Sequence, residues 1–344
     1  MPNRIGGMDY FFWAFQKACD DKGIVVDWFF PNSPTISKYA NLNIIASNTK
    51  IETQFLTHMQ QTKVVYSHII THFLELCTPF YKTLKKQTTA KIIAVDHNPR
   101  PLEGYPLKKQ FKKRLKGWLY GNSIDLFVGV SKYTSSEIIK DFGAHLTPKV
   151  ITIYNGVMLK DIVYRDTMSY DIPKFLVVSH LRKSKGIQDL IEAVALLPKE
   201  LRASIKIDIY GKGSYKEILD ELIVHKSLQK VFTFKGSVDI LHKLYCRYDY
   251  LLQPTHMECF SLSILESLAA NVPVVTTNVG GNEEVVIHNE NGYIFKAQNI
   301  QVLSQILKNI INHSKKILTP TRNLVIEEFS IDAMVANHLK LITS

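Results

Sequence analysis

The stretch from residue 250 to residue 284 constrains the fold of this chain more than any other part of the sequence. It begins with the apolar run Tyr250–Leu252, which predicts a buried strand. Apolar residues at Leu262, Leu265, Leu268 and Ala269 then predict a helix that Asn271 closes, and Pro273–Thr277 predicts the next strand. A Gly-Gly pair opens a turn into a further helix. This alternation is typical of a parallel sheet, in which ligands bind where the strands end.

Two carboxylates lie in this stretch, Glu258 in the turn after the first strand and Glu266 on the helix. A Pro-Val-Val strand begins at Pro273, the glycine pair Gly280-Gly281 follows as the fourth element, and Glu284, three residues after the pair, is the fifth. In this order the five elements resemble the family 4 type of retaining glycosyltransferase, of the kind that builds bacterial surface polysaccharides. Two glutamates at this spacing would mean little alone, but five ordered elements make the resemblance specific.

The resemblance implies the GT-B fold, an α/β fold of two Rossmann-like, doubly wound parallel-sheet domains that face a cleft. We expect an acceptor-side domain at 1–170, a nucleotide-sugar-binding domain at 171–320, and a C-terminal helix at 321–344 that crosses back to the first domain. A chain of 344 residues suits two domains of about 150 residues each. In the resembled family a strand precedes the glycine pair that begins here at Gly6. Almost nothing precedes it in this chain, so we expect that strand to be missing or badly shortened, either because the native start lies upstream or because the chain has been trimmed.

Short apolar segments alternate with helical stretches between residues 41 and 95. Ile44–Ile45, Val64–Tyr66 and Ile92–Val95 are expected strands of a parallel sheet. The last of them brings His97 to the carboxyl end of that sheet. A lone His after a strand is more often structural, whereas the resembled family places a His near the donor sugar. Both roles therefore stay open for His97.

The second domain is expected to open with a buried strand at Phe175–Val178. After it, Lys185 and the following glycine match the phosphate-binding segment of the resembled family. The arginine of that segment is His180 here, and Arg182 lies two residues later. The resemblance implies that Lys185 and Arg182 hold the diphosphate leaving group, whose negative charge grows as the glycosidic bond breaks.

Glu258 and Glu266 have different roles in the resembled family. Glu266 would accept hydrogen bonds from the ribose hydroxyls and so fix the position of the donor. Glu258 would contact the sugar that is transferred. The resemblance therefore implies catalytic roles for Glu258, Lys185, His97 and Arg182, and donor-binding roles for Gly6, Gly7, His180, Gly211, Val238, Phe260, Ser261, Leu262 and Glu266.

The implied reaction is transfer of a hexosyl group from a nucleotide-diphosphate sugar, a UDP-sugar above all, to a hydroxyl group with retained configuration. The sequence has no Asp-x-Asp segment, so we expect catalysis without a metal ion and without any cofactor. The expected acceptor is a lipid-linked glycan in capsule or exopolysaccharide synthesis. Two alternatives stay open: a nucleotide-sugar 2-epimerase, and a nucleotide-sugar-binding protein without turnover.

The net charge of +11 is unevenly distributed, with +9 over residues 1–170 and +2 over residues 171–344. A basic first half indicates an acidic partner, and phosphate or an anionic membrane ranks above nucleic acid because no nucleic-acid motif is visible. Residues 106–120 predict a helix with Phe111 and Trp118 on an apolar face and lysines around the remainder. This helix either lies on an anionic membrane surface or packs its apolar face onto the sheet.

The four cysteines lack C-x-x-C spacing, and we expect reduced thiols rather than disulfides or metal ligands. The first residues do not follow the pattern of a signal peptide, and no apolar run is long enough to span a bilayer. We therefore expect a cytoplasmic protein, either free or peripheral on the inner membrane face.

Overall fold

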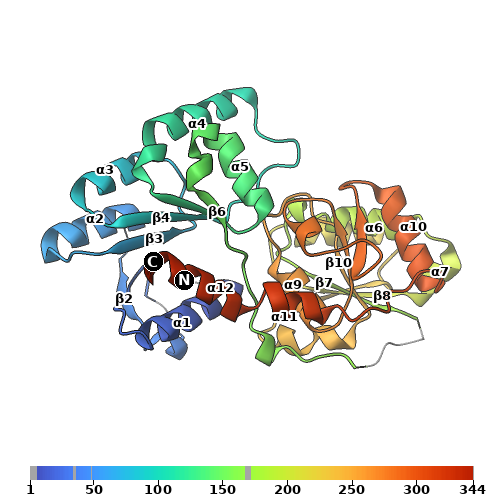
Figure 1. The fold of residues 1–344 in the computed structure, drawn as a ribbon. Coiled ribbons are helices and arrows are strands. Elements are labelled where there is room, and N and C mark those ends of the chain that lie inside the picture. The colour runs from blue at the N-terminus through green and yellow to red at the C-terminus, as the bar shows by residue number, and fades with distance from the viewer. Residues whose placement is uncertain (1–5, 34–35, 48, 167–171, 344) are drawn as a thin grey trace. The chain divides into compact units, whose positions relative to one another are not determined.

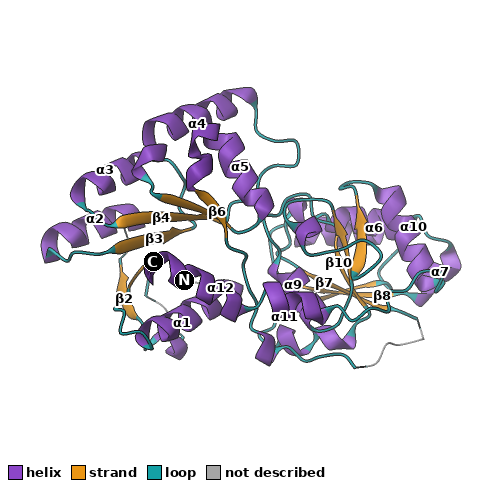
Figure 2. Cartoon of the chain, viewed as in Figure 1, coloured by secondary structure: helices purple, strands orange, loops and turns teal. Residues whose placement is uncertain are grey.

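The structure is a computed structural model that describes residues 6–33, 36–47, 49–166 and 172–343. The chain divides into two compact units, each with a sheet of parallel strands flanked by helices (Figures 1 and 2). Unit 1 comprises residues 1–98, 105–156 and 331–344, and unit 2 comprises residues 99–104 and 157–330.

The boundary between the units lies after residue 156, earlier than the expected 170. The backbone N–H of Val157 donates to the carbonyl of Phe329 at 3.0 Å, and Arg165 donates to Ala270 at 3.0 Å. These bonds attach the connecting segment to unit 2. Unit 2 also continues to residue 330, beyond the expected 320, before the chain returns to unit 1.

Unit 2 is built on a six-stranded sheet in which every pairing is parallel. The strand order is β12-β11-β10-β7-β8-β9, so successive strands move outward in opposite directions from the pair β7 and β10. Ligands in open parallel sheets bind at such a reversal point. The strands are β7 (Lys174–Val178), β8 (Lys206–Tyr210), β9 (Phe232–Gly236), β10 (Tyr250–Gln253), β11 (Val274–Thr277) and β12 (Gly292–Phe295).

The helices of unit 2 bury their apolar faces against this sheet, as the periodicity predicts. One expected helix is different: the residues after the Gly-Gly pair form a single 3-10 turn, Asn282–Glu284. The buried amide of Asn282 donates to Thr276 at 3.1 Å and to the carbonyl of Thr277 at 3.2 Å, which ties this turn to the end of β11. The helices are α6 (Ile187–Ala195), α7 (Lys199–Ser204), α8 (Lys216–His225), α9 (Leu262–Ala269), α10 (Ile300–Ile311) and α11 (Arg322–Glu328).

Unit 1 contains a four-stranded sheet in the order β3-β4-β5-β6 and a separate pair, β1-β2, all parallel. The strands are β1 (Asp27–Phe30), β2 (Asn43–Ala46), β3 (His68–His72), β4 (Lys91–Asp96), β5 (Leu126–Gly129) and β6 (Val150–Thr152). The helices are α1 (Gly7–Asp20), α2 (Ile51–Thr62), α3 (Pro79–Gln87), α4 (Leu107–Tyr120), α5 (Lys132–Phe142) and α12 (Ile331–Thr343).

The strand expected at Val64–Tyr66 is wrong, because β3 begins at His68. Helix α2 ends on Lys63 in the left-handed conformation, at φ +56°, and the next residues connect that helix to the sheet. Val64 and Val65 are exposed there. The prediction failed because these apolar residues lie in an exposed connecting loop, although their sequence pattern is that of a buried strand.

Helix α12 packs against α1 within unit 1. The rings of Phe11 and His338 lie 4.7 Å apart, and the ammonium of Lys91 donates to the carbonyl of Leu341 at 3.2 Å. The prediction of a missing first strand concerns residues before Gly6, which lie outside the described residues. Among the described residues, each helix is too short or too polar to cross a bilayer.

Candidate active site

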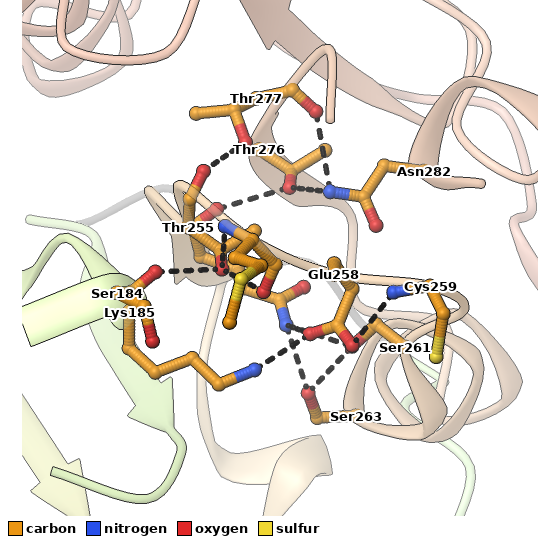
Figure 3. Close-up of polar contacts among 12 residues, drawn as sticks. Ser184, Lys185, Thr255, Glu258, Cys259, Ser261, Ser263, Thr276, Thr277 and Asn282 are labelled. Atoms are coloured by element: carbon orange, nitrogen blue, oxygen red, sulfur yellow. Dashed lines mark hydrogen bonds and ion pairs between the residues drawn. The ribbon is translucent and has the colours of Figure 1, made fainter. Parts of the chain in front are cut away.

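The candidate site of unit 2 lies at the carboxyl ends of β7 and β10, where the strand order reverses. Two loops meet there, one after each strand (Figure 3). The carbonyl of Ser184 accepts hydrogen bonds from the backbone N–H of His256 at 2.8 Å and from the hydroxyl of Thr255 at 3.2 Å. These bonds hold the phosphate-binding segment expected from the sequence against the loop that carries Glu258.

Lys185 and Glu258 form an ion pair in this site, with Nζ and Oε2 2.7 Å apart. Their side chains are only 20% and 12% exposed, respectively, so the pair is partly removed from water. The other carboxylate oxygen of Glu258 accepts from the backbone N–H of Cys259 at 3.3 Å. A cation and an anion thus lie side by side at this edge of the sheet, and each could exchange its partner for a ligand group of opposite charge.

Helix α9 begins at Leu262, four residues after Glu258 in the chain. Phe260 and Ser261 are buried, and Leu262, the first residue of α9, is half-buried. The side-chain amide of Gln253 donates to the Ser261 hydroxyl at 2.7 Å, which fixes the start of the helix. Backbone N–H groups at such a helix start favour a negatively charged ligand.

Glu266 lies one turn further along α9 and is held by a residue that the sequence reading missed. Tyr245 is fully buried, and its hydroxyl donates to Oε2 of Glu266 at 2.7 Å. Burial, and then the charge of Glu266, raise the pKa of Tyr245 well above its usual value, so this hydroxyl stays protonated. No motif surrounds Tyr245, and only the packing of the turn before β10 against α9 reveals its contact.

The Gly-Gly turn packs against the backbone of the loop that carries Glu258. Gly280 has φ +64°, and a Cβ atom added there would lie 2.3 Å from the carbonyl oxygen of Glu258. The backbone N–H of Gly281 donates to the carbonyl of Cys259 at 2.9 Å. This turn therefore requires glycine because it passes close to the backbone of the loop that carries the carboxylate.

A second pair that the sequence reading missed is His256 with Asp189, whose Nε2 and Oδ2 atoms lie 2.6 Å apart. It joins the loop after β10 to the first turn of α6. Gly186 precedes that helix at φ +69°, and a Cβ atom there would lie 1.7 Å from the carbonyl oxygen of Pro254. The two loops are therefore in direct backbone contact beside Lys185.

The remaining predicted residues of unit 2 lie on the same edge of the sheet, after their strands. Gly211 follows β8 at φ +135°, and a Cβ atom there would lie 1.8 Å from the carbonyl oxygen of Ser179. Val238 is half-buried after β9. His180 and Arg182 are exposed after β7, whereas Lys185 is half-buried. The structure therefore joins Lys185 to Glu258 and leaves the guanidinium of Arg182 on the surface.

The predicted residues of unit 1 lie at the end of β4 and at the start of α1. His97 is buried, its Nε2 lies 3.0 Å from Nδ1 of His72, and its ring stacks on Phe73 at 4.2 Å. Burial, together with the nearby His338, lowers the pKa of His97 to about 4, so its imidazole is neutral at pH 7. At the start of α1, Asp9 accepts the backbone N–H of Gly6 and so satisfies one donor of the expected anion site at Gly6 and Gly7.

Known proteins share the fold of the chain, and the sequence of unit 2 is similar to a known family. Residues 169–323 match the family model described as glycosyl transferases group 1. A glycosyltransferase from Rickettsia africae superimposes with a TM-score of 0.78 at 18% identity, over 98% of this chain and 94% of that chain. Anabaena HepE in complex with UDP gives the same TM-score and identity, over 98% of this chain and 96% of that chain.

The chain has the GT-B fold. The fold expected from the sequence is thereby confirmed. Among curated proteins, the GtfA subunit of the UDP-N-acetylglucosamine–peptide N-acetylglucosaminyltransferase of Streptococcus pneumoniae is 28% identical over 189 residues, which are 54% of this chain and 37% of that protein. The chain spans less than half the length of the first curated relatives that it matches. The resemblance to glycosyltransferases is confirmed at the level of the family model over unit 2.

Proposed function

We propose that this protein is a retaining glycosyltransferase that transfers a hexosyl group from a UDP-sugar to a hydroxyl group. The observation that carries the proposal is the Lys185–Glu258 ion pair beside the start of α9, at the point where the strand order of the sheet reverses. A cation, a carboxylate and the N–H groups of a helix start at one edge suit a ligand with a diphosphate at one end and sugar hydroxyls at the other. The family model over unit 2 supports the same reaction.

The diphosphate is the natural partner for Lys185. When it arrives, its oxygens compete with Glu258 for the ammonium, and the carboxylate is released to accept hydroxyl hydrogens of the sugar. As the bond from the anomeric carbon to the phosphate oxygen breaks, negative charge accumulates on that oxygen. Lys185 and the N–H groups at the start of α9, at Ser261 and Leu262, stabilise this charge, and exposed Arg182 is a second cation within the same segment.

The ribose of the nucleotide is the partner that we assign to Glu266. The hydroxyl of Tyr245 donates to Oε2 of Glu266 and so orients the carboxylate, and a carboxylate can accept several hydrogen bonds, including those of ribose hydroxyls. The turns at Gly211 and Val238 follow neighbouring strands and would accommodate the nucleotide, because glycine permits close approach of the backbone.

The reaction requires no metal ion in this proposal, since lysine and helix N–H groups supply the positive charge that a divalent cation would otherwise provide. The phosphate oxygen that departs from the sugar accepts the proton of the acceptor hydroxyl on the same face. This step retains the configuration of the sugar and needs no dedicated base. His97 of unit 1 is neutral, so the role that the resemblance implies for it would be exerted through hydrogen bonding rather than through charge.

The acceptor that we propose is a lipid-linked glycan in capsule or exopolysaccharide synthesis. The uneven charge of the chain, +9 in its first 170 residues, supports an acidic or membrane-bound acceptor for that half. The relative from Streptococcus pneumoniae is named for a UDP-linked donor, which supports UDP as the leaving group here.

The test is a thermal-shift and turnover screen with UDP-, GDP- and ADP-sugars, each with and without EDTA. We expect stabilisation by the UDP series and slow donor hydrolysis that EDTA leaves unchanged. Glu258→Gln should lower turnover about 100- to 1000-fold while UDP still raises the Tm. The matched control is Glu283→Gln, an exposed carboxylate in the adjoining 3-10 turn, which should keep full turnover.

Each alternative has its own outcome in this screen. If the Glu258→Gln variant kept full turnover, the role assigned to Glu258 would be contradicted. Loss of donor hydrolysis in EDTA would contradict metal independence. Epimerised sugar without transfer would identify a 2-epimerase. Binding of UDP without hydrolysis or transfer to any acceptor would identify a binding protein. The anomeric configuration of the product, read by NMR, tests retention.

A further inference from the structure

Helix α4 of unit 1 carries an apolar stripe that faces away from the protein. Leucine and aromatic residues three and four positions apart share one face of a helix. On a helix packed in the usual way that face is buried, but here it is exposed. The stripe consists of Leu107 (82% exposed), Phe111 (74%), Leu115 (45%), Trp118 (72%) and Leu119 (41%).

The opposite face of α4 makes the contact with the rest of unit 1. Gly117 is the one buried residue of the helix, and a Cβ atom added there would lie 1.8 Å from the carbonyl oxygen of Phe142 at the end of α5. Lys113 donates to Asp141 at 2.8 Å from the same side. The helix is therefore fixed by Gly117 and Lys113, and the alternative in which its apolar stripe packs onto the sheet is wrong.

Positive charge surrounds the stripe. Lys108 and Lys112 are exposed, and among the residues that the structure describes neither has a carboxylate within ion-pair distance. From Gly104 to Ile124 the sequence contains six lysine or arginine residues and no aspartate or glutamate. Self-association through this face would bring like charges together, whereas an anionic surface would neutralise them.

We propose that α4 is a docking surface for an anionic lipid bilayer, with the stripe among the acyl chains and Lys108 and Lys112 at the lipid phosphates. Trp118 and Phe111 are the two large aromatic side chains of the stripe, and tryptophan in particular favours the membrane interface. Lysines flanking such a stripe bind anionic headgroups electrostatically. This inference is independent of the transfer reaction, because bilayer binding needs neither donor nor turnover.

The test is flotation of the full chain with vesicles of phosphatidylcholine alone and of phosphatidylcholine with an equal part of phosphatidylglycerol. We expect the protein to float with the anionic vesicles, to float poorly with the neutral ones, and to be released by high salt. Equal binding to both vesicles, or none to the anionic ones, would overturn the proposal. So would a dimer in sedimentation equilibrium that Trp118→Ser converts to a monomer.

Two pairs of variants separate the apolar from the charged contribution. Phe111→Ser with Trp118→Ser should lower the partition coefficient for anionic vesicles at least about tenfold. Its control is Leu196→Ser with Ile218→Ser, two exposed apolar residues of unit 2, which should bind like the unchanged protein. Because all four side chains are solvent-exposed, the fold should be kept, and an unchanged thermal shift with UDP checks unit 2 independently.

The charge variant is Lys108→Gln with Lys112→Gln, and its control is Lys199→Gln with Lys308→Gln on exposed positions of unit 2. The variant should lower the partition coefficient for anionic vesicles about thirtyfold, because each lysine near the surface contributes about fivefold. If the control variant lost as much vesicle binding, the effect would be one of overall charge, and the assignment of the docking surface to α4 would be overturned.

Discussion

Replacing Gly186 with alanine is expected to destabilise unit 2 and to disturb the candidate site at the same time. Gly186 has φ +69°, and a Cβ atom there would lie 1.7 Å from the carbonyl oxygen and 2.7 Å from the carbonyl carbon of Pro254. Both neighbours are backbone atoms, so no side-chain rotation can relieve the contact. The loops after β7 and β10 would have to separate by about 1.5 Å to restore normal contact distances.

The magnitude follows from three terms. Alanine in the left-handed conformation costs about 1 kcal/mol relative to glycine. Separation of the loops weakens the hydrogen bonds from Thr255 and His256 to the carbonyl of Ser184, at about 1 kcal/mol each. Overpacking of a tight contact adds about 1–3 kcal/mol. We therefore expect a loss of about 5 kcal/mol in the free energy of unfolding.

The assay is urea denaturation followed by circular dichroism, with Gly236→Ala as the matched control. Gly236 lies in the same unit at φ +70°, but a Cβ atom there would meet only the end of Lys212, at 4.0 Å. It should lose about 1 kcal/mol, the conformational term alone. If Gly186→Ala loses no more than Gly236→Ala, the close approach of the two loops does not govern stability and the reasoning is refuted. The UDP thermal shift should fall only in Gly186→Ala, because Lys185 is the residue immediately before Gly186.

Two further predictions concern the buried side chains of Tyr245 in unit 2 and His338 in unit 1. Tyr245→Phe removes the hydroxyl that holds Glu266, and we expect the KM for the donor to rise about tenfold with little change in kcat; a kcat effect alone would contradict a positioning role. Burial lowers the pKa of His338 from 6.5 to about 4. Between pH 6.5 and pH 4, His338 is therefore protonated in the unfolded chain but neutral in the folded chain. Stability should therefore fall by about 2 kcal/mol from this group between pH 7 and pH 5, and His338→Phe should show a correspondingly shallower loss in urea denaturation. An identical pH dependence in the variant would contradict this assignment.

The sequence predicted the features of the site that depend on local order along the chain. Glu258 follows an apolar run and Glu266 lies on the next helix, so alternation of strand and helix was enough to place both near the carboxyl end of a sheet. Lys185 follows another buried strand in the same way. The exact boundaries of the units were not predictable, because they depend on hydrogen bonds such as that from Val157 to Phe329, between residues far apart in the sequence.

Partners that lie far apart along the chain required the tertiary structure. The ion pair of Lys185 with Glu258 spans 73 residues, and nothing local to either residue specifies the other. Tyr245 and the His256–Asp189 pair carry no motif at all, so their contacts with the site appear only when β10, α6 and α9 are packed.

Helix α4 shows the same division most plainly. The sequence determined that residues 106–120 form an amphipathic, basic helix, because the spacing of apolar residues and the intrinsic preferences of lysine and leucine act within a few residues. It left open which face is buried. Tertiary packing decided that at Gly117, where the absence of a side chain lets α5 approach, and so turned Phe111 and Trp118 to the outside. Local periodicity fixes the pattern on a helix, but only the neighbouring elements fix its orientation.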